Sequence, residues 1–324
     1  MSSFRSDMND GPIHPDGNNQ IEHLRGGNGM NTSFIRGIIP AMITPMTEDE
    51  RLDEKGFKRL IDGLIGAGVH GIFTVGTAGE FWALTLEEKK TVFEWTVQMT
   101  GKRCPVYLGT CANSTREAVL LSEYAQRAGA DCVSVLTPSY ITPSQDQLFE
   151  HYAAIAGAVD IPILLYNLPA RTGNRISVQL AVRLAERFDN IVGIKDSSGD
   201  FSNAMALLDS APPSFRLVMG NDAMILPALM LGASAAIAAT ANVAPEIAVG
   251  IYENFIKGDI EAARDFQRRL TPIRNLFALG THPAMLKAGA EMAGYAGGPP
   301  RAPVGRLTES ERKKLTEVLT GIGR

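Results

Sequence analysis

The chain has 324 residues, of which 45% are hydrophobic and 20% charged, and its formal net charge is -4 at pH 7. This composition is typical of a globular protein without the basic excess that binding to nucleic acids requires. No apolar run approaches the ~20 residues of a membrane span, and the start lacks an apolar signal core, so we expect a cytoplasmic protein.

Cysteine and histidine usage argues against disulfides and metals. The three cysteines, Cys104, Cys111 and Cys132, include no close pair with metal-ligand spacing and are expected to be reduced. The five histidines are scattered and form no pair at helical spacing. We therefore expect no metal site built from these residues.

The first 33 residues are rich in Gly, Asn, Asp and Ser and contain few large apolar residues. Such a segment cannot bury enough surface to offset the entropy of ordering. We expect residues 1–33 to form a flexible extension.

From Gly37 onward a repeating unit begins, in which a short apolar run is followed by a turn and a segment with helical spacing. Alternation of this kind predicts an α/β protein with parallel strands joined by helices. Eight repeats favour a closed (β/α)8 TIM barrel over an open sheet, and no glycine-rich dinucleotide or P-loop motif supports the open sheet. The predicted strands are Ile38–Ile43, Gly71–Val75, Val106–Thr110, Cys132–Leu136, Ile163–Tyr166, Ile191–Lys195, Arg216–Met219 and Ala235–Ala239.

Helix signals lie between and after these strands. Thr85 to Glu88 and Ser114 to Glu117 each have the pattern of a capping box. After the eighth strand only helical patterns remain. We expect a barrel over residues 34–258 and additional C-terminal helices over residues 259–324.

The strand Ile191–Lys195 is nearly continuous in apolar residues and delivers one lysine at its end. A strand buried on both faces has this composition, so Lys195 is expected to lie in a dry environment. An amine removed from water is a nucleophile toward carbonyl groups. When the residue is considered alone, a lysine that reaches solvent through its long stem is the simpler explanation.

Other strand ends carry groups that suit the same chemistry, because strand C-termini converge on the functional face of such a barrel. The turn from Gly76 to Gly79 can bind a carboxylate through backbone N–H groups, Tyr166 can relay protons, and Arg171 can hold a second carboxylate. A plain turn, a core tyrosine and a solvated arginine are the structural alternatives. For Glu80 and Asp196 we expect capping or ion pairing rather than acid–base chemistry.

Four strand-end motifs in order along the chain resemble those of the dihydrodipicolinate synthase and N-acetylneuraminate lyase family of Schiff-base-forming aldolases. The resemblance covers roughly Ile35 to Leu319. The motifs are G-T-x-G-E after the second strand, T-P-x-Y after the fourth, Y-N-x-P-x-R-T-G after the fifth and G-I-K-D in the sixth.

This resemblance implies catalytic roles for four residues and a pocket role for a fifth. Lys195 matches the Schiff-base lysine, Tyr166 the proton donor and acceptor, and Thr77 the relay hydroxyl. Tyr140 matches a tyrosine that reaches the site of a neighbouring subunit, and Ile237 a residue whose backbone lines the pyruvate pocket. A homotetramer built as a dimer of dimers is implied as well. Because the iminium on the lysine acts as the electron sink, neither a metal nor an organic cofactor is expected.

Substrate binding is implied for Ala78, Gly79 and Arg171. The family often has a second hydroxyl at the position of Ala78, so only backbone N–H groups remain there. Arg171 matches the arginine that holds the aldehyde's carboxylate in the synthases.

We therefore expect a pyruvate-dependent lyase of the dihydrodipicolinate synthase type, condensing pyruvate with aspartate semialdehyde. The alternative is the same chemistry on another 2-oxo acid, as a 2-keto-3-deoxy sugar acid or N-acetylneuraminate-type aldolase, a dehydratase or a deaminase. A non-catalytic barrel that serves as a binding protein is the third possibility.

Overall fold

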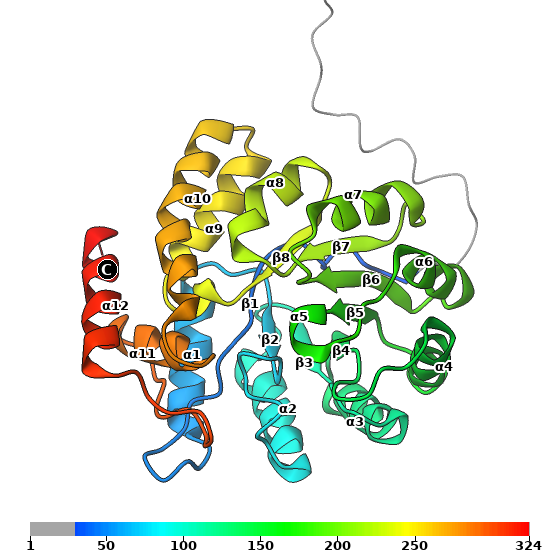
Figure 1. The fold of residues 1–324 in the computed structure, drawn as a ribbon, viewed down its shortest axis with the longest axis horizontal. Coiled ribbons are helices and arrows are strands. Elements are labelled where there is room, and N and C mark those ends of the chain that lie inside the picture. Colours follow the sequence, from blue (N-terminus) through cyan, green and yellow to red (C-terminus); the bar gives the residue numbers. More distant parts are fainter. Residues whose placement is uncertain (1–29, 324) are drawn as a thin grey trace, which may run out of the picture. The chain divides into compact units, whose positions relative to one another are not determined.

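A computed structural model of the protein describes residues 30–323. Within them eight strands form one parallel sheet in the order β1-β8-β7-β6-β5-β4-β3-β2, as Figure 1 shows. The prediction of a (β/α)8 barrel with additional C-terminal helices is confirmed. The strands are β1 (Gly37–Pro40), β2 (Ile72–Thr74), β3 (Val106–Gly109), β4 (Cys132–Leu136), β5 (Ile163–Asn167), β6 (Ile191–Asp196), β7 (Arg216–Met219) and β8 (Ala235–Ala238).

The ring closes between β1 and β2 through a single parallel bridge, from Ala41 to Phe73. The predicted first strand, Ile38–Ile43, is too long by three residues. Ile43 remains buried, but its amide donates to the side-chain oxygen of Asn242 at 2.9 Å rather than to a neighbouring strand. An apolar run thus indicates burial, but the strand pairing ends where a backbone amide bonds to a side chain instead of a neighbouring strand.

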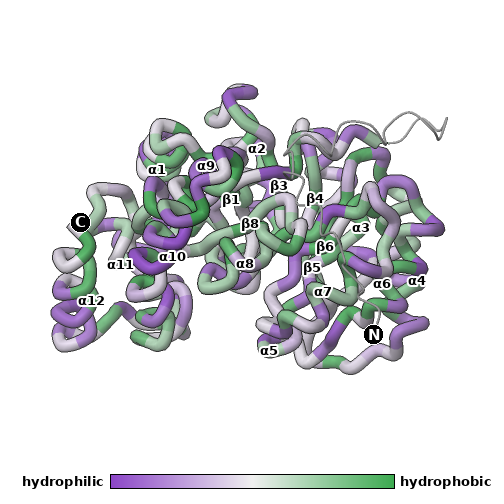
Figure 2. The backbone as a smooth tube through the Cα atoms, turned by 90° about the horizontal axis from the view of Figure 1, so that it is seen from above, coloured by the Kyte–Doolittle hydropathy of each residue, from purple (hydrophilic) through white to green (hydrophobic). Residues whose placement is uncertain are grey.

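Helices surround the strands on the outside (Figure 1). They are α1 (Glu54–Gly66), α2 (Leu86–Thr100), α3 (Thr115–Ala128), α4 (Gln145–Ala156), α5 (Pro169–Thr172), α6 (Val178–Arg187), α7 (Phe201–Ser210), α8 (Ile225–Met230), α9 (Pro245–Ile256), α10 (Ile260–Asn275), α11 (Ala284–Met292) and α12 (Glu309–Gly321), with short 3-10 turns η1 (Asp222–Met224), η2 (Thr240–Asn242) and η3 (Leu276–Ala278). Figure 2 shows hydrophilic and hydrophobic stretches alternating along outer helices such as α10 and α12. This pattern is that of helices with one face packed on the protein.

The two predicted capping boxes have different outcomes. At Thr85 both halves form, because its side chain accepts from the amide of Glu88 and the Glu88 carboxylate accepts from the amide of Thr85. Ser114 caps α3 in the same way, but the side chain of Glu117 instead pairs with Lys89 at 3.2 Å. The motif correctly located both helix starts.

The C-terminal helices α10, α11 and α12 gather at one side of the barrel (Figure 1), and the chain from Asn31 onward forms one compact unit. Lys287 of α11 forms an ion pair with Glu80 at 2.6 Å, and both side chains are at most 1% exposed. The division at residues 258 and 259 stays a prediction. Residues 1–29 of the predicted flexible extension lie outside the described residues.

Candidate active site

Lys195 lies near the carboxyl end of β6 and is 3% exposed. It is paired in register with Tyr166 of β5, and its Nζ lies 3.9 Å from the centroid of the Tyr166 ring. A second ring, that of Phe73 on β2, has its centroid 4.7 Å from the same nitrogen. The amine therefore lies against two aromatic rings and has little contact with water.

The Tyr166 hydroxyl continues the site toward the loop after β2. It lies 3.2 Å from Oγ1 of Thr77, and either oxygen can donate. The lysine, the phenol and the threonine hydroxyl thus come from three different strand ends and meet at one place. A hydrogen-bonded pair of hydroxyls beside an amine can move protons without bulk water.

The loop from Gly76 to Gly79 has the features of an anion site. Val75, which precedes it, adopts φ +54°, a left-handed conformation that is unusual and costly for a β-branched residue. Within the described chain no acceptor faces the amides of Ala78 and Gly79. A Cβ at Gly79 would lie 3.0 Å from the amide nitrogen of Val75, so this tight fold needs glycine.

These groups open onto a cavity of about 160 Å³. Six of the sequence-predicted site residues line it, namely Thr77, Ala78, Tyr166, Arg171, Lys195 and Ile237. Gly79 is not among the lining residues, and its carbonyl oxygen accepts from Oγ1 of Thr44 at 2.8 Å. The cavity has room for a small substrate only.

Tyr140 is the predicted site residue that the structure keeps apart from the others. It follows β4, adopts φ +74° and is 98% exposed. The preceding residue is fixed, since the amide and hydroxyl of Ser139 both donate to Oδ1 of Asn113 at 2.9 Å. The tyrosine therefore projects from an anchored loop away from the cavity of its own chain.

Sequence reasoning missed several residues that line the cavity: Ser197, Asn221, Asp222, Arg274, Phe277 and His282. Asn221 and Asp222 follow β7, so their strand-end position was a usable signal. Burial raises the pKa of Asp222, whose Oδ2 accepts from the amide of Thr240 at 2.7 Å. Burial, with the nearby cations Arg171, Lys195 and Arg274, lowers the pKa of His282 to about 4.

Glu80 forms an ion pair, as expected, whereas Asp196 accepts hydrogen bonds and neither caps a helix nor forms an ion pair in the described chain. Glu80 pairs with Lys287 and accepts from the amide of Arg301 at 2.8 Å. Asp196 accepts from Asn167, and from the amide of Ser198, both at 3.0 Å. No group of three or more metal-binding side chains occurs among residues 30–323.

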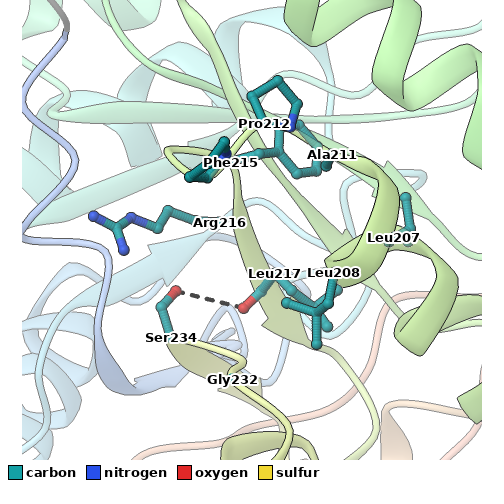
Figure 3. Close-up of a pocket in the computed structure, with 10 residues that line it drawn as sticks. Leu207, Leu208, Ala211, Pro212, Phe215, Arg216, Leu217, Gly232 and Ser234 are labelled. Carbon is teal, nitrogen blue, oxygen red and sulfur yellow. Dashed lines mark hydrogen bonds between the residues drawn. The ribbon is translucent and has the colours of Figure 1, made fainter. Parts of the chain in front are cut away.

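A second hollow, of about 120 Å³, lies at the opposite end of the barrel (Figure 3). It is bounded by the end of α7 and by the residues that lead into β7 and β8. There Oγ of Ser234 donates to the carbonyl of Leu217 at 3.4 Å, and Arg216 donates to Oγ1 of Thr32. Most of its lining residues are apolar, and they include no cysteine, lysine or carboxylate.

Among residues 30–323, no helix is both long and apolar enough to cross a membrane.

Fold and site together define a (β/α)8 barrel protein with a buried lysine at the carboxyl ends of its strands. A model of the dihydrodipicolinate synthetase family matches residues 34–322. The chain belongs to this family, so the resemblance that the strand-end motifs indicated is confirmed.

Known proteins are similar over nearly the whole described chain. The 4-hydroxy-tetrahydrodipicolinate synthase of Methanopyrus kandleri is 40% identical over 290 residues, 89% of this chain and 97% of that protein. The dihydrodipicolinate synthase of Acinetobacter baumannii, solved in complex with pyruvate, is 38% identical and has a TM-score of 0.85, covering 89% and 99%. A prophage protein of E. coli K12 from the same family, also solved with pyruvate, is 32% identical with a TM-score of 0.86, covering 89% and 98%.

Proposed function

We propose that this protein is a class I lyase that condenses pyruvate with aspartate semialdehyde through a Schiff base on Lys195. The observation that carries the proposal is the contact between the Lys195 amine and Tyr166, whose hydroxyl is linked to Thr77 at 3.2 Å. The similarity to synthases of that name over 89% of the chain supports the choice of substrates.

In the proposed reaction the Lys195 amine attacks the ketone carbon of pyruvate, and the resulting carbinolamine loses water to give an iminium. The iminium withdraws electrons, so the methyl group loses a proton and becomes an enamine nucleophile. The enamine carbon then attacks the acceptor aldehyde, and water releases the product and restores the amine. Tyr166, relayed by Thr77, is the proposed carrier of protons in these steps.

The carboxylate of pyruvate has a proposed site at the amides of Ala78 and Gly79, beside the backbone of Ile237. These amides lack an acceptor within the described chain, and fixed N–H dipoles of this kind stabilise an anion. Arg171 lies in the lining of the same cavity and is the proposed ligand of the acceptor's carboxylate.

The proposal includes a homo-oligomer, a tetramer built from two dimers, in which Tyr140 completes the site of a neighbouring subunit. Its support is the anchored loop that presents a 98% exposed tyrosine. We also infer a cytoplasmic location from the free thiols of Cys104, Cys111 and Cys132. Neither a cofactor nor a nucleic acid is part of the proposal.

A second candidate function is aldol cleavage of a 2-keto-3-deoxy sugar acid at the same lysine. The hydroxyl of Ser197 and the amide of Asn221 line the cavity and favour a substrate with several hydroxyl groups. Dehydration or deamination of a related 2-oxo acid would use the same iminium.

Treatment with pyruvate and borohydride tests the proposal, because reduction traps the iminium as a stable secondary amine. The intact mass of the chain is expected to rise by one reduced pyruvate, and Lys195→Ala is expected to abolish the gain. Turnover is then compared between aspartate semialdehyde with pyruvate and a 2-keto-3-deoxy sugar acid. An unchanged mass overturns the Schiff base, and turnover of the sugar acid alone favours the second function.

A further inference from the structure

The stretch from the last turn of α10 to the start of α11 supplies three residues to the cavity: Arg274, Phe277 and His282. The guanidinium carbon of Arg274 lies 4.6 Å from the centroid of the Phe277 ring. Stacking on an aromatic face restrains the long arginine side chain and leaves its N–H donors available at the ring's edges. Arg274 is therefore held at the cavity with N–H donors available for a ligand.

The cavity carries more positive than negative charge. Among residues 30–323 neither Arg171 nor Arg274 forms an ion pair, although the Asp222 carboxylate lies close enough to Arg274 for the two charges to interact. Asp222 is the one carboxyl group among the lining residues, and one of its oxygens already accepts from the backbone. A cluster in which cations outnumber anions is the electrostatic signature of a site for an anionic ligand.

Pyruvate does not account for this surplus. Its carboxylate has a proposed site at the backbone amides beside Thr77, and its ketone is consumed by Lys195. Two guanidinium groups then remain for the second substrate. His282 is neutral near pH 7, because burial and the surrounding cations lower its pKa to about 4. It can form a hydrogen bond with a polar group without adding charge.

We propose that Arg274 is a specificity-determining residue that binds the carboxylate of the acceptor aldehyde jointly with Arg171. This inference rests on the proposed Schiff-base function and deepens it by assigning a second arginine to acceptor recognition. The cavity volume of about 160 Å³ limits the acceptor to a short carbon chain.

The test compares Arg274→Gln with Arg268→Gln, a control on the same helix whose side chain is 70% exposed and pairs with Asp265. Three acceptors are used: aspartate semialdehyde, succinic semialdehyde, which keeps the carboxylate but lacks the amine, and butyraldehyde, which lacks both. Arg274→Gln is expected to raise KM for the first two at least tenfold and to leave butyraldehyde turnover, the KM of pyruvate and borohydride trapping unchanged. Arg274→Lys is expected to recover part of the loss, because it keeps the charge but not the planar fork.

Each other outcome has a defined meaning. Equal losses with all three acceptors, or values like those of the Arg268→Gln control, overturn the inference while trapping of pyruvate by the wild-type chain upholds the proposed function. Absence of trapping in the wild-type chain overturns both.

Discussion

At the scale of single residues, the Tyr166 side chain makes two separate contributions to the site. The centroid of its ring lies 3.9 Å from the Lys195 amine, whereas its hydroxyl forms a hydrogen bond with Thr77. Tyr166→Phe keeps the ring and removes the hydroxyl. We expect kcat to fall by about 10²–10⁴, the usual contribution of a positioned proton carrier, with pyruvate trapping slowed but still complete.

Steady-state kinetics and timed borohydride quenching check this expectation. Thr137→Val is a matched control, since it removes a buried hydroxyl after the neighbouring strand β4 that bonds to Thr172 rather than to Tyr166. If Tyr166→Phe turns over at the wild-type rate, the hydroxyl has no part in proton transfer.

His151 makes a prediction about pH. It is 5% exposed on α4, its Nδ1 lies 2.9 Å from Oγ1 of Thr115, and burial lowers its pKa to about 4. The unfolded chain, in which histidine titrates near its ordinary value of about 6.5, binds the proton more readily between these two values. Stability is therefore full above about pH 6.5 and declines as the pH falls toward 4.

We expect His151 to account for a loss of roughly 1–3 kcal/mol in the free energy of unfolding across this interval. The measurement is urea unfolding at several pH values for the wild-type chain and for His151→Asn, whose amide can still bond to Thr115. The variant should show a correspondingly weaker pH dependence. Parallel curves would mean that the imidazole titrates normally in the folded protein.

At the scale of elements, the ion pair between Glu80 and Lys287 joins α11 to the loop after β2. Both groups lie out of water, so removing one of them leaves an uncompensated buried charge. We expect Lys287→Met to destabilise the protein by about 3–5 kcal/mol. The double variant Glu80→Gln with Lys287→Met should lose less, because the glutamine carbonyl can still accept from the amide of Arg301.

Lys287→Met, Glu80→Gln and the double variant form a double-mutant cycle with the wild-type chain, and their stabilities are measured by thermal and urea unfolding. The exposed pair of Arg306 and Glu48 is a suitable control, since pairs in water contribute little. A double variant that loses as much as the sum of its single variants would show that the two charges do not depend on each other.

The same scale explains what the sequence could predict. Lys195, Tyr166 and Thr77 were found because a repeated strand signal indicates which residues end strands, and parallel strands bring their ends together. Arg274 and His282 were missed because helical spacing after β8 does not indicate which face meets the barrel. The close backbone packing at Gly79 could not be predicted for a related reason: it appears only once Val75 and Met42 are positioned.

At the scale of the whole molecule, the exposure of Tyr140 predicts complementation between subunits. Tyr140→Phe and Lys195→Ala should each have low activity alone. In mixed dimers the Lys195→Ala subunit supplies an intact tyrosine to the other subunit's intact lysine. Because half of the randomly paired dimers are mixed and each has one complete site, about a quarter of wild-type activity is expected.

Co-expression of the two variants, with light scattering to establish the oligomer, tests this expectation. Two Lys195→Ala subunits carrying different tags control for co-expression itself. Activity equal to the mean of the separate variants would place Tyr140 outside the neighbouring site.

The residues that line the cavity come from two different parts of the chain. Its reactive amine and phenol are rooted in strands at the centre of the barrel, whereas Arg274, Phe277 and His282 arrive together on one short stretch near the end. Substitutions within residues 274–282 are therefore expected to change which acceptor the enamine attacks, while Lys195 and Tyr166 stay in place. Exchanging residues 274–282 between relatives is accordingly expected to give enzymes that join pyruvate to other aldehydes.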